Sequence, residues 1–374
     1  MSHLDRRDWL KHSTMALAGM SFAGTLFGRE KPWQELWEYE AEPTLIRIGQ
    51  NENPYGPSAA TKKAMMESLG ISNRYPSELV AELREKIAKA YGLTKEHLLL
   101  GAGSSELLGN TAALAAQRKG SNVVTGDPTF RVWFGAAEMY GLSLKKVPLT
   151  AGKVHDLDAM LAAMDGNTSM VYVVNPHNPT GTVVADADLQ RFAEKVTEKA
   201  ILLLDEAYTE YSDVKSLAPM VRDNKNLVVA KTFSKIYGLA GARVGFVLAH
   251  PDTIKKLAAW QPWANASPSA VSLTGAIAAM DDTAFMKYSR DNNELVKQYV
   301  TVELTKMGYK VIPSHTSFFY YDAAPFKGDL AAVMQAANFS AIRIFEPTTT
   351  WRRTSLGTMD EMKKFLKVLK ESNA

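Results

Sequence analysis

The sequence predicts an α/β protein in which a large layered domain is joined to a smaller α/β domain. Between about residues 98 and 249, short apolar runs alternate with helical patterns. Runs that are apolar on both faces are typical of strands in a sheet that helices cover on both sides. After Pro268 the pattern changes to a long helical stretch, then short apolar segments and a last helix. Together these patterns predict two parts that pack against each other and form a cleft.

The expected elements follow in order along the chain. The strands of the large part are the runs LLLGAG, NVVTGD, MVYVVNP, AILLLDEAY, NLVVAKTFSK and ARVGFVLA. Segment 185–200 has its apolar residues on one helical face and charges on the other, as a crossover helix between parallel strands does. In the smaller part we expect helices over 268–307, 330–337 and 359–369, with apolar segments at 309–313, 317–322 and 341–345. We place the large domain at 66–265 and the small domain at 31–65 and 266–374.

Composition excludes several classes of protein and site. The chain has 43 basic and 40 acidic residues, a net charge of +3 and no long run of Lys or Arg, so we expect no nucleic-acid partner. Because it has no cysteine, disulfides, thiolate metal sites and cysteine nucleophiles are excluded. Its seven histidines lack the HExxH spacing that places two imidazoles on one helical face, so we expect no metal site.

The N-terminus resembles a twin-arginine export signal. A charged segment that includes Arg6 and Arg7 precedes a mildly apolar stretch over residues 14–27. The match is incomplete, because Asp5 and Trp9 replace the usual residues and no clear cleavage site follows. The stretch is too short to span a bilayer comfortably, so we expect no stable membrane span. We expect residues 1–30 to direct export to the periplasm; the alternative is an N-terminal helix or disordered segment on a cytoplasmic protein.

The segment TFSKIYGLAGARVGF, residues 232–246, is the most informative one. It places Lys235 at the end of an apolar strand, before a glycine-rich turn and Arg243. A lysine desolvated beside a cleft can have a lowered pKa and act as an amine nucleophile toward an aldehyde. Most lysines only solvate a surface, so this segment needs support from other motifs.

Such support comes from AILLLDEAY, where apolar residues lead into Asp205 and Tyr208. A carboxylate at the end of a buried strand is costly unless a cation or hydrogen-bond donors meet it. A protonated pyridine nitrogen would be such a cation, and Tyr208 could bond a phenolic oxygen of the same ring. The alternative is a capped strand end with an incidental acid.

Two further segments are suited to binding a ligand. In VYVVNPHNPTG, prolines fix the backbone and Asn178 can hold its amide toward a ligand, although an isolated turn of this kind is usually structural. In LLLGAGSSELL, Ser104 and Ser105 lie at a helix start, where amides and hydroxyls can bind an anion. This segment lacks the lysine of a P-loop and is not a GxSxG elbow, so a phosphate group fits best.

In order and spacing, these motifs resemble the pyridoxal 5′-phosphate (PLP)-dependent aminotransferases of fold type I, class I/II, in the histidinol-phosphate aminotransferase-like branch. The resemblance covers roughly residues 43–370. It rests on NENPYGPS, RYP, GAGSSE, DPTF, NPHNPTG, DEAY, SKIYGLAGAR and RRTSLGT. It implies an aspartate-aminotransferase-like fold, with a mixed, mostly parallel sheet in the PLP-binding large domain.

The resemblance also assigns roles to residues. Lys235 would hold PLP as a Schiff base and shuttle the substrate proton, and Asp205 would pair with the pyridine nitrogen. Tyr75 would reach the coenzyme phosphate of a neighbouring subunit, which implies a homodimer. The remaining residues expected at the coenzyme are Ser104, Ser105, Phe130, Asn178, Tyr208, Ser234 and Arg243.

Expectations for the substrate are less complete. The resemblance places Arg353 where it would bind a carboxylate or phosphate, with Arg343, Asn53 and Tyr55 as further substrate-binding residues. Ser317, however, stands where the branch usually has Asn, and a WRR sequence replaces a more apolar lead-in to Arg353. The amino donor and the acceptor therefore stay open, and so does the use of histidinol phosphate.

We expect an aminotransferase that moves an amino group between an amino acid or related amine and a 2-oxo acid. Two alternatives remain. A PLP-dependent decarboxylase, lyase or oxidase would use the same fold and coenzyme. A non-enzymatic regulator could borrow the fold, although we expect no DNA-binding domain before residue 43.

Overall fold

The structure is a computed structural model that describes residues 45–373. Residues from Ile46 onward form one compact unit. The expected export signal over 1–30 lies outside the described residues, as do residues 31–44 of the segment 31–65 that we assigned to the small domain. The boundaries of the two domains stay predictions.

The central feature is a seven-stranded sheet with strand order β1-β7-β6-β5-β4-β2-β3. Strand β7 runs antiparallel to both of its neighbours, and the pairings from β6 to β3 are all parallel, so the sheet is mixed and mostly parallel, as predicted. The strands are β1 Leu98–Gly101, β2 Asn122–Asp127, β3 Ser143–Pro148, β4 Thr168–Val174, β5 Ile201–Asp205, β6 Leu227–Thr232 and β7 Gly245–Ala249.

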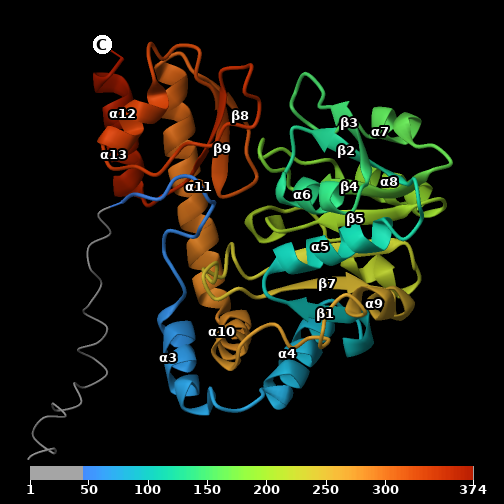
Figure 1. The fold of residues 1–374 in the computed structure, drawn as a ribbon. Coiled ribbons are helices and arrows are strands. Elements are labelled where there is room, and N and C mark those ends of the chain that lie inside the picture. The colour runs from blue at the N-terminus through green and yellow to red at the C-terminus, as the bar shows by residue number, and fades with distance from the viewer. Residues whose placement is uncertain (1–44, 374) are drawn as a thin grey trace, which may run out of the picture. The chain divides into compact units, whose positions relative to one another are not determined.

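Helices cover both faces of this sheet, which explains why its strands, apart from the edge strand β3, are mostly buried and apolar (Figure 1). In β4, Val171 and Val173 contribute to one core, whereas Met170 and Tyr172 contribute to the other. The first face carries α4 Ser77–Ala90, α7 Leu157–Ala163, α8 Asp186–Thr197 and α10 Ala270–Asp281. The second carries α5 Ser104–Ala115, α6 Val132–Met139 and α9 Pro251–Ala258. Helix α8 is the crossover helix predicted over 185–200.

Strand β3 was not among the predicted strands. It pairs with β2 alone, at the edge of the sheet, and of its residues only Val147 is buried. A strand that is largely exposed need not be an apolar run, so the pattern that identified the other six strands could not find it.

The smaller part is built on a three-stranded antiparallel sheet of order β10-β9-β8, with β8 Lys310–Ile312, β9 Phe318–Asp322 and β10 Trp351–Ser355. Helices α11 Thr283–Lys306, α12 Leu330–Ala336 and α13 Met359–Glu371 share its core. In Figure 1, α11 runs from this sheet toward α10. The expected helix over 268–307 is thus divided, because Asp282 caps the start of α11 by accepting from the amide of Phe285.

Segment 341–345, expected as an element of the smaller part, forms no strand. Its only ladder contact is an isolated bridge between Arg343 and Arg353. The third strand is β10, which begins after the loop that follows this segment. The remaining elements are α3 Ala59–Glu67 and the short helices η1 Ser68–Ile71, η2 Lys95–His97, η3 Thr209–Tyr211 and η4 Ala218–Arg222.

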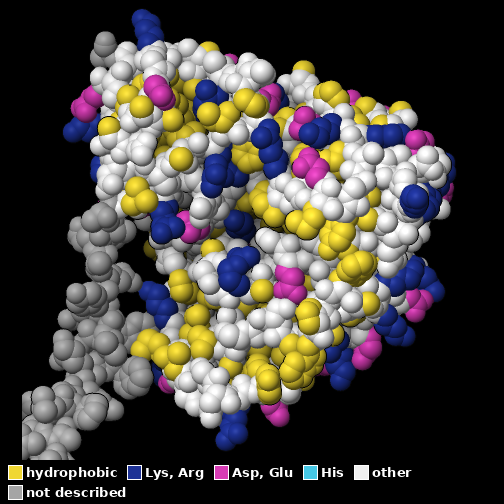
Figure 2. Space-filling model, in the orientation of Figure 1, with side chains coloured by type: hydrophobic (Ala, Val, Ile, Leu, Met, Phe, Trp, Pro, Cys, Tyr) yellow, Lys and Arg dark blue, Asp and Glu magenta, His cyan; other side chains and the backbone are white. Residues whose placement is uncertain are grey.

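On the surface drawn in Figure 2, basic side chains are interspersed with acidic and apolar ones. Within residues 45–373, no helix has the length and apolar character needed to cross a membrane.

Candidate active site

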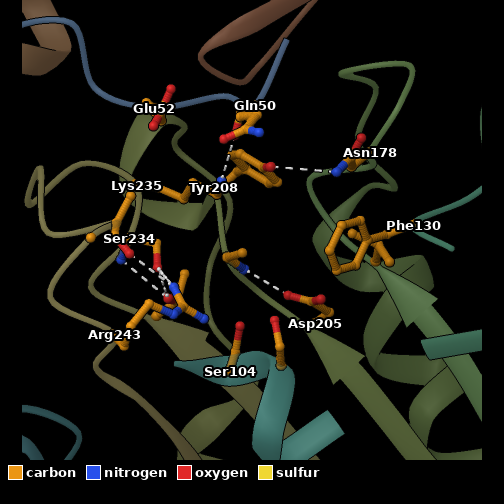
Figure 3. A pocket seen from close by; sticks show the side chains of 16 residues that line it. Gln50, Glu52, Ser104, Phe130, Asn178, Asp205, Tyr208, Ser234, Lys235 and Arg243 are labelled. Atoms are coloured by element: carbon orange, nitrogen blue, oxygen red, sulfur yellow. Dashed lines mark hydrogen bonds between the residues drawn. The ribbon is translucent and has the colours of Figure 1, made fainter. Parts of the chain in front are cut away.

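A cavity of about 320 Å³ lies at the carboxyl ends of the strands of the large sheet. Asp205 ends β5, Lys235 follows β6, and Asn178 follows β4. Ligands of open α/β sheets bind at this edge, because the loops there converge. The lining residues are Gln50, Glu52, Ser104, Ser105, Phe130, Val174, Asn178, Asp205, Ala207, Tyr208, Thr232, Ser234, Lys235, Ala240, Gly241 and Arg243 (Figure 3).

The amine of Lys235 lies inside this cavity. Its Nζ donates to the carbonyl oxygen of Gln50 over 3.2 Å and lies 5.6 Å from the centre of the Tyr208 ring. Burial, and next the positive charge of Arg353, lower the pKa of Lys235 to about 8, although Asp205 acts in the opposite direction. An amine with this pKa is partly uncharged near neutral pH, which is the form that attacks a carbonyl carbon.

Asp205 presents a buried carboxylate to the cavity, with 3% of its surface exposed. Its Oδ1 accepts from the amide of Ala207 at 3.1 Å, and its Oδ2 accepts from the hydroxyl of Tyr172 at 3.3 Å. Burial raises the pKa of Asp205 to about 6, against these two hydrogen bonds. Within residues 45–373 no Lys, Arg or His nitrogen forms an ion pair with it, so it can receive a cation from a ligand.

Tyr208 and Asn178 add polar groups to the lining of the cavity. Asn178 Nδ2 donates to the Tyr208 hydroxyl over 3.4 Å. Burial raises the pKa of Tyr208 to about 12, so the phenol keeps its proton near neutral pH. The pair can therefore offer hydrogen bonds to an oxygen atom on a bound ring.

A third group of residues forms an anion site at the start of α5. The N-cap residue Gly103 has φ 77° and no capping side chain, so the first amides of α5 stay open toward the cavity beside Ser104. Arg243 lies against this turn and donates from Nη1 to Ser234 Oγ over 3.3 Å. A Cβ on Gly103 would lie 2.1 Å from Arg243 Nη2, so only glycine permits this arrangement. Open amides, hydroxyls and a guanidinium together suit a phosphate.

The model of the class I and II aminotransferases matches residues 43–369 of the chain. The chain belongs to this family. The histidinol-phosphate aminotransferase of Halalkalibacterium halodurans is 38% identical over 291 residues, which are 77% of this chain and 78% of the relative. The enzyme of the same name from Bacillus subtilis strain 168 is 32% identical over 335 residues, 87% of this chain and 91% of the relative.

Solved structures agree with this assignment. The histidinol-phosphate aminotransferase of Sinorhizobium meliloti, determined in complex with pyridoxal-5′-phosphate, superposes with a TM-score of 0.79 at 27% identity, covering 88% of this chain and 90% of that one. The aspartate aminotransferase of Thermus thermophilus with maleate has a TM-score of 0.77 at 19% identity, with both chains fully covered, and shows the fold. The predicted aspartate-aminotransferase-like fold, the PLP coenzyme and the aminotransferase activity are thereby confirmed.

The cavity of this aminotransferase fits PLP at each of the coenzyme's polar groups. The unpaired carboxylate of Asp205 suits a protonated pyridine nitrogen, and the open start of α5 with Arg243 suits a phosphate. The amine of Lys235 lies in the same cavity and suits the aldehyde. Phe130, after β2, lines the cavity with its ring on the side opposite Lys235 (Figure 3).

Arg353 of the aminotransferase is buried beside the cavity and reaches it through Asn178. Its Nη1 donates to Asn178 Oδ1 at 2.8 Å, and its Nη2 donates to the carbonyl oxygen of Gly49 at 2.6 Å. The guanidinium lies 5.4 Å and 5.0 Å from the ring centres of Phe318 and Phe345. Burial lowers its pKa to about 10, so it stays charged. Its Nε is buried and has no partner among the described residues.

The other predicted substrate residues lie outside the cavity lining. The exposed Arg343 donates from Nε to the carbonyl oxygen of Gly49 over 3.1 Å. Asn53 is buried, and its Nδ2 donates to the carbonyl oxygen of Ile236 at 2.8 Å and to Ser289 Oγ at 3.1 Å, which ties two segments together. Tyr55 packs edge-on against Tyr288, with 5.3 Å between ring centres. Their roles in substrate binding stay predictions.

Tyr75 also lies away from this cavity. Its side chain is 77% exposed and its ring lies 5.1 Å from that of Trp263. An exposed position is what a residue that serves a neighbouring subunit requires, but the neighbouring subunit itself stays a prediction.

Sequence reasoning missed three side chains of the segment that precedes α3, those of Gln50, Asn51 and Glu52. Gln50 and Glu52 line the cavity from this segment, and Glu52 Oε2 is buried without a partner among the described residues. Asn51 lies between them and contacts Tyr208, with 2.9 Å between Nδ2 and the hydroxyl. The available signal was the motif that begins at Asn51, from which we took only Asn53 and Tyr55 as expected site residues. Within residues 45–373, no cluster of His, Asp and Glu could hold a metal ion.

Proposed function

We propose that this aminotransferase carries out transfer of an amino group to a 2-oxo acid with Lys235 as its catalytic amine. The observation that carries the proposal is the convergence of Lys235, Asp205 and the open start of α5 on one cavity. An amine with a lowered pKa, an unpaired buried carboxylate and an anion site are the three features that PLP requires of a protein.

When bound, PLP supplies a ring that withdraws electrons from the substrate's α-carbon. The Asp205 carboxylate would keep the pyridine nitrogen protonated, which strengthens that withdrawal. Tyr208 and Asn178 would hold the ring oxygen, and Phe130 would pack against the ring face. The phosphate would be held by Ser104, Ser105, Ser234 and Arg243.

Lys235 would move the proton. Its Nζ, whose pKa burial lowers to about 8, would accept the proton that the α-carbon of the substrate gives up and would deliver it to the coenzyme carbon that carried the aldehyde. Burial and the Arg353 charge both favour the uncharged amine, so the residue is suited to act as a base near neutral pH.

The proposed amino donor carries an anionic group. Arg353 is buried near the rings of Phe318 and Phe345 with its Nε unpaired, and a desolvated guanidinium binds a carboxylate or phosphate strongly. The relatives' name indicates a phosphorylated amino alcohol as the donor. Ser317, which is buried with an unpaired Oγ at the position usually held by Asn, argues instead for a donor other than histidinol phosphate. Histidinol phosphate and ordinary amino acids are therefore to be compared directly.

The test is a donor panel with purified protein, PLP and 2-oxoglutarate, in which both glutamate and carbon dioxide are measured. Histidinol phosphate, aspartate, aromatic and cationic amino acids would form the panel. We expect glutamate to form with at least one anionic donor and to disappear in Lys235→Ala, while the exposed-lysine variant Lys225→Ala keeps its activity. Carbon dioxide release without glutamate from the whole panel would instead support the decarboxylase alternative.

We also propose a homodimer and export. The exposed pair of Tyr75 and Trp263, and the exposed pair of Tyr140 and Trp260, are typical of surfaces that a partner covers. Light scattering should give twice the chain mass, and Tyr75→Ala should weaken PLP binding.

Fractionation of cells that produce the full chain should place it in the periplasm, and replacing Arg6 and Arg7 by Lys should retain it in the cytoplasm.

A further inference from the structure

Asn51 is a buried residue whose side chain contacts the Tyr208 hydroxyl. Only 1% of its surface is exposed, and its backbone has φ 55°, a left-handed conformation that asparagine tolerates better than most residues. The distance from Asn51 Nδ2 to the hydroxyl oxygen is 2.9 Å, shorter than the 3.4 Å from Asn178 Nδ2. Asn51 is therefore the better placed of the two amide donors to this oxygen.

Ser355 of β10 fixes the orientation of the Asn51 amide. Ser355 Oγ accepts from the backbone amide of Asn51 at 2.8 Å and lies 2.8 Å from Asn51 Oδ1. A hydroxyl that accepts from an N–H group still has one proton to donate, and here it donates to Oδ1. Because Oδ1 is occupied in this way, Nδ2 must face Tyr208. Ser355 is itself 1% exposed, so no water competes freely for these bonds.

Two amides donate to the hydroxyl oxygen of Tyr208, which restricts the directions in which the hydroxyl can donate its own proton. A tyrosine oxygen accepts hydrogen bonds through its lone pairs and donates one proton. Asn51 and Asn178 both approach as donors, so the proton of Tyr208 cannot be given to either of them. The cavity, which Tyr208 lines, is the remaining direction in which an acceptor would lie.

We propose that Asn51 is a positioning residue, held by Ser355, that directs the Tyr208 proton into the cavity toward the ring oxygen of PLP. This proposal rests on the proposed function, because it requires PLP in this cavity. Asn51 acts only through Tyr208 and touches no reacting atom.

A purely structural role is the alternative. The amide of Ser355 also donates to the carbonyl oxygen of Ile48 at 2.8 Å, so Asn51 could simply tie the segment before α3 to the small sheet. Such a tie would contribute to the stability of the fold. It would leave the ionisation of the bound coenzyme unchanged. A pH titration of the bound coenzyme therefore distinguishes the two roles.

The readout is the pH midpoint of the absorbance change of the purified holoenzyme. A hydrogen bond donated to the ring oxygen withdraws electron density, so that the Lys235 nitrogen joined to the coenzyme loses its proton at lower pH. Replacing Asn51 by glycine, which suits φ 55° and adds no charge, should raise this midpoint by about one pH unit, as expected for loss of one buried hydrogen bond. The charges of Asp205, Glu52, Arg353 and Arg243, which act on Lys235, remain in the variant.

A double-mutant cycle isolates the route through Tyr208. We expect Tyr208→Phe to raise the midpoint as well, and Asn51→Gly to add nothing in the Tyr208→Phe background. The matched control is Asn338→Gly, at an exposed asparagine with φ 68°, which should leave the midpoint in place. Should Asn51→Gly fail to fold, Ser355→Ala keeps the Asn51 side chain but releases its orientation, and should shift the midpoint in the same direction.

An unchanged midpoint in the folded Asn51→Gly protein, or shifts of Asn51→Gly and Tyr208→Phe that add in the double variant, would overturn the proposal. The titration requires bound coenzyme but no turnover. A failed donor panel with a normal titration would thus count against the proposed reaction and not against the role of Asn51.

Discussion

Arg353 Nη1 donates to Asn178 Oδ1 over 2.8 Å, although Arg353 lies in β10 of the small sheet, Asn178 follows β4 of the large one, and the two residues are 175 positions apart in the chain. Two positions further along β10, Ser355 holds Asn51. Alternate residues of one strand thus orient two amides that meet at the Tyr208 hydroxyl. The small sheet thus orients side chains at a cavity whose lining residues come mostly from the strands of the large sheet and the segments that follow them.

Replacing Asp205 by asparagine should lower turnover but raise the stability of the coenzyme-free protein. The change keeps the shape but removes the charge that would hold the pyridine nitrogen protonated, so turnover should fall about 10²-fold or more. Burial raises the pKa of Asp205 to about 6 from 3.8. A raised pKa favours the folded state at low pH, and that contribution is lost as pH rises through 6.

Coenzyme-free Asp205→Asn should therefore be more stable than the unchanged protein at pH 7.5, by up to about 3 kcal/mol for a shift of this size. The difference should shrink toward pH 4.5, and urea unfolding at both pH values measures it. A coenzyme-free variant less stable than the unchanged protein at pH 7.5 would contradict this account of a carboxylate without a cation.

Replacing Arg353 by methionine should raise the pKa of Lys235. Arg353 is the nearby positive charge that, after burial, lowers the pKa of this amine to about 8, and removing a like charge favours the charged amine. The rate at which coenzyme-free protein takes up PLP should then rise with pH around a higher midpoint, closer to the ordinary lysine value. The control is Arg343→Met, because Arg343 donates to the same Gly49 carbonyl oxygen but is exposed. Equal midpoints in both variants would refute the assignment.

Replacing Gly245 by alanine should damage the phosphate site. A Cβ at Gly245 would lie 2.2 Å from the backbone nitrogen of Ser104, which cannot move without displacing the start of α5. We expect the dissociation constant of PLP to rise at least about tenfold, since each 1.4 kcal/mol of lost binding is a factor of ten. Gly109→Ala, in the same helix with nothing within 4 Å of its added Cβ, should bind PLP normally and gain up to about 1 kcal/mol in stability. Equilibrium titration with PLP compares the two, and equal affinities would be the contrary result.

The parts of the site that the sequence predicted are those with a local signal. Asp205 and Lys235 follow apolar runs, and strands of a parallel sheet end at a common edge, so their meeting could be expected. Ser104 follows a small-residue turn before a helix, which indicates an anion site without further information.

What the sequence could not predict depends on distant partners. Asn51 and Ser355 are 304 positions apart, and no local sequence pattern at either residue predicts their contact. Segment 341–345 has the composition of a strand but forms only a single bridge. The strand that pairs with β9 is β10, which begins after the loop that follows this segment. Strand β3 lies at an edge, where exposure removes the apolar run.

The measurement that tests the central claim most directly is borohydride reduction of the PLP-loaded protein, followed by peptide mapping. The account predicts one pyridoxyl group, on Lys235, and none in Lys235→Ala. A protein that takes up no PLP, or a label on the buried neighbour Lys231 or on any other lysine in place of Lys235, would contradict it.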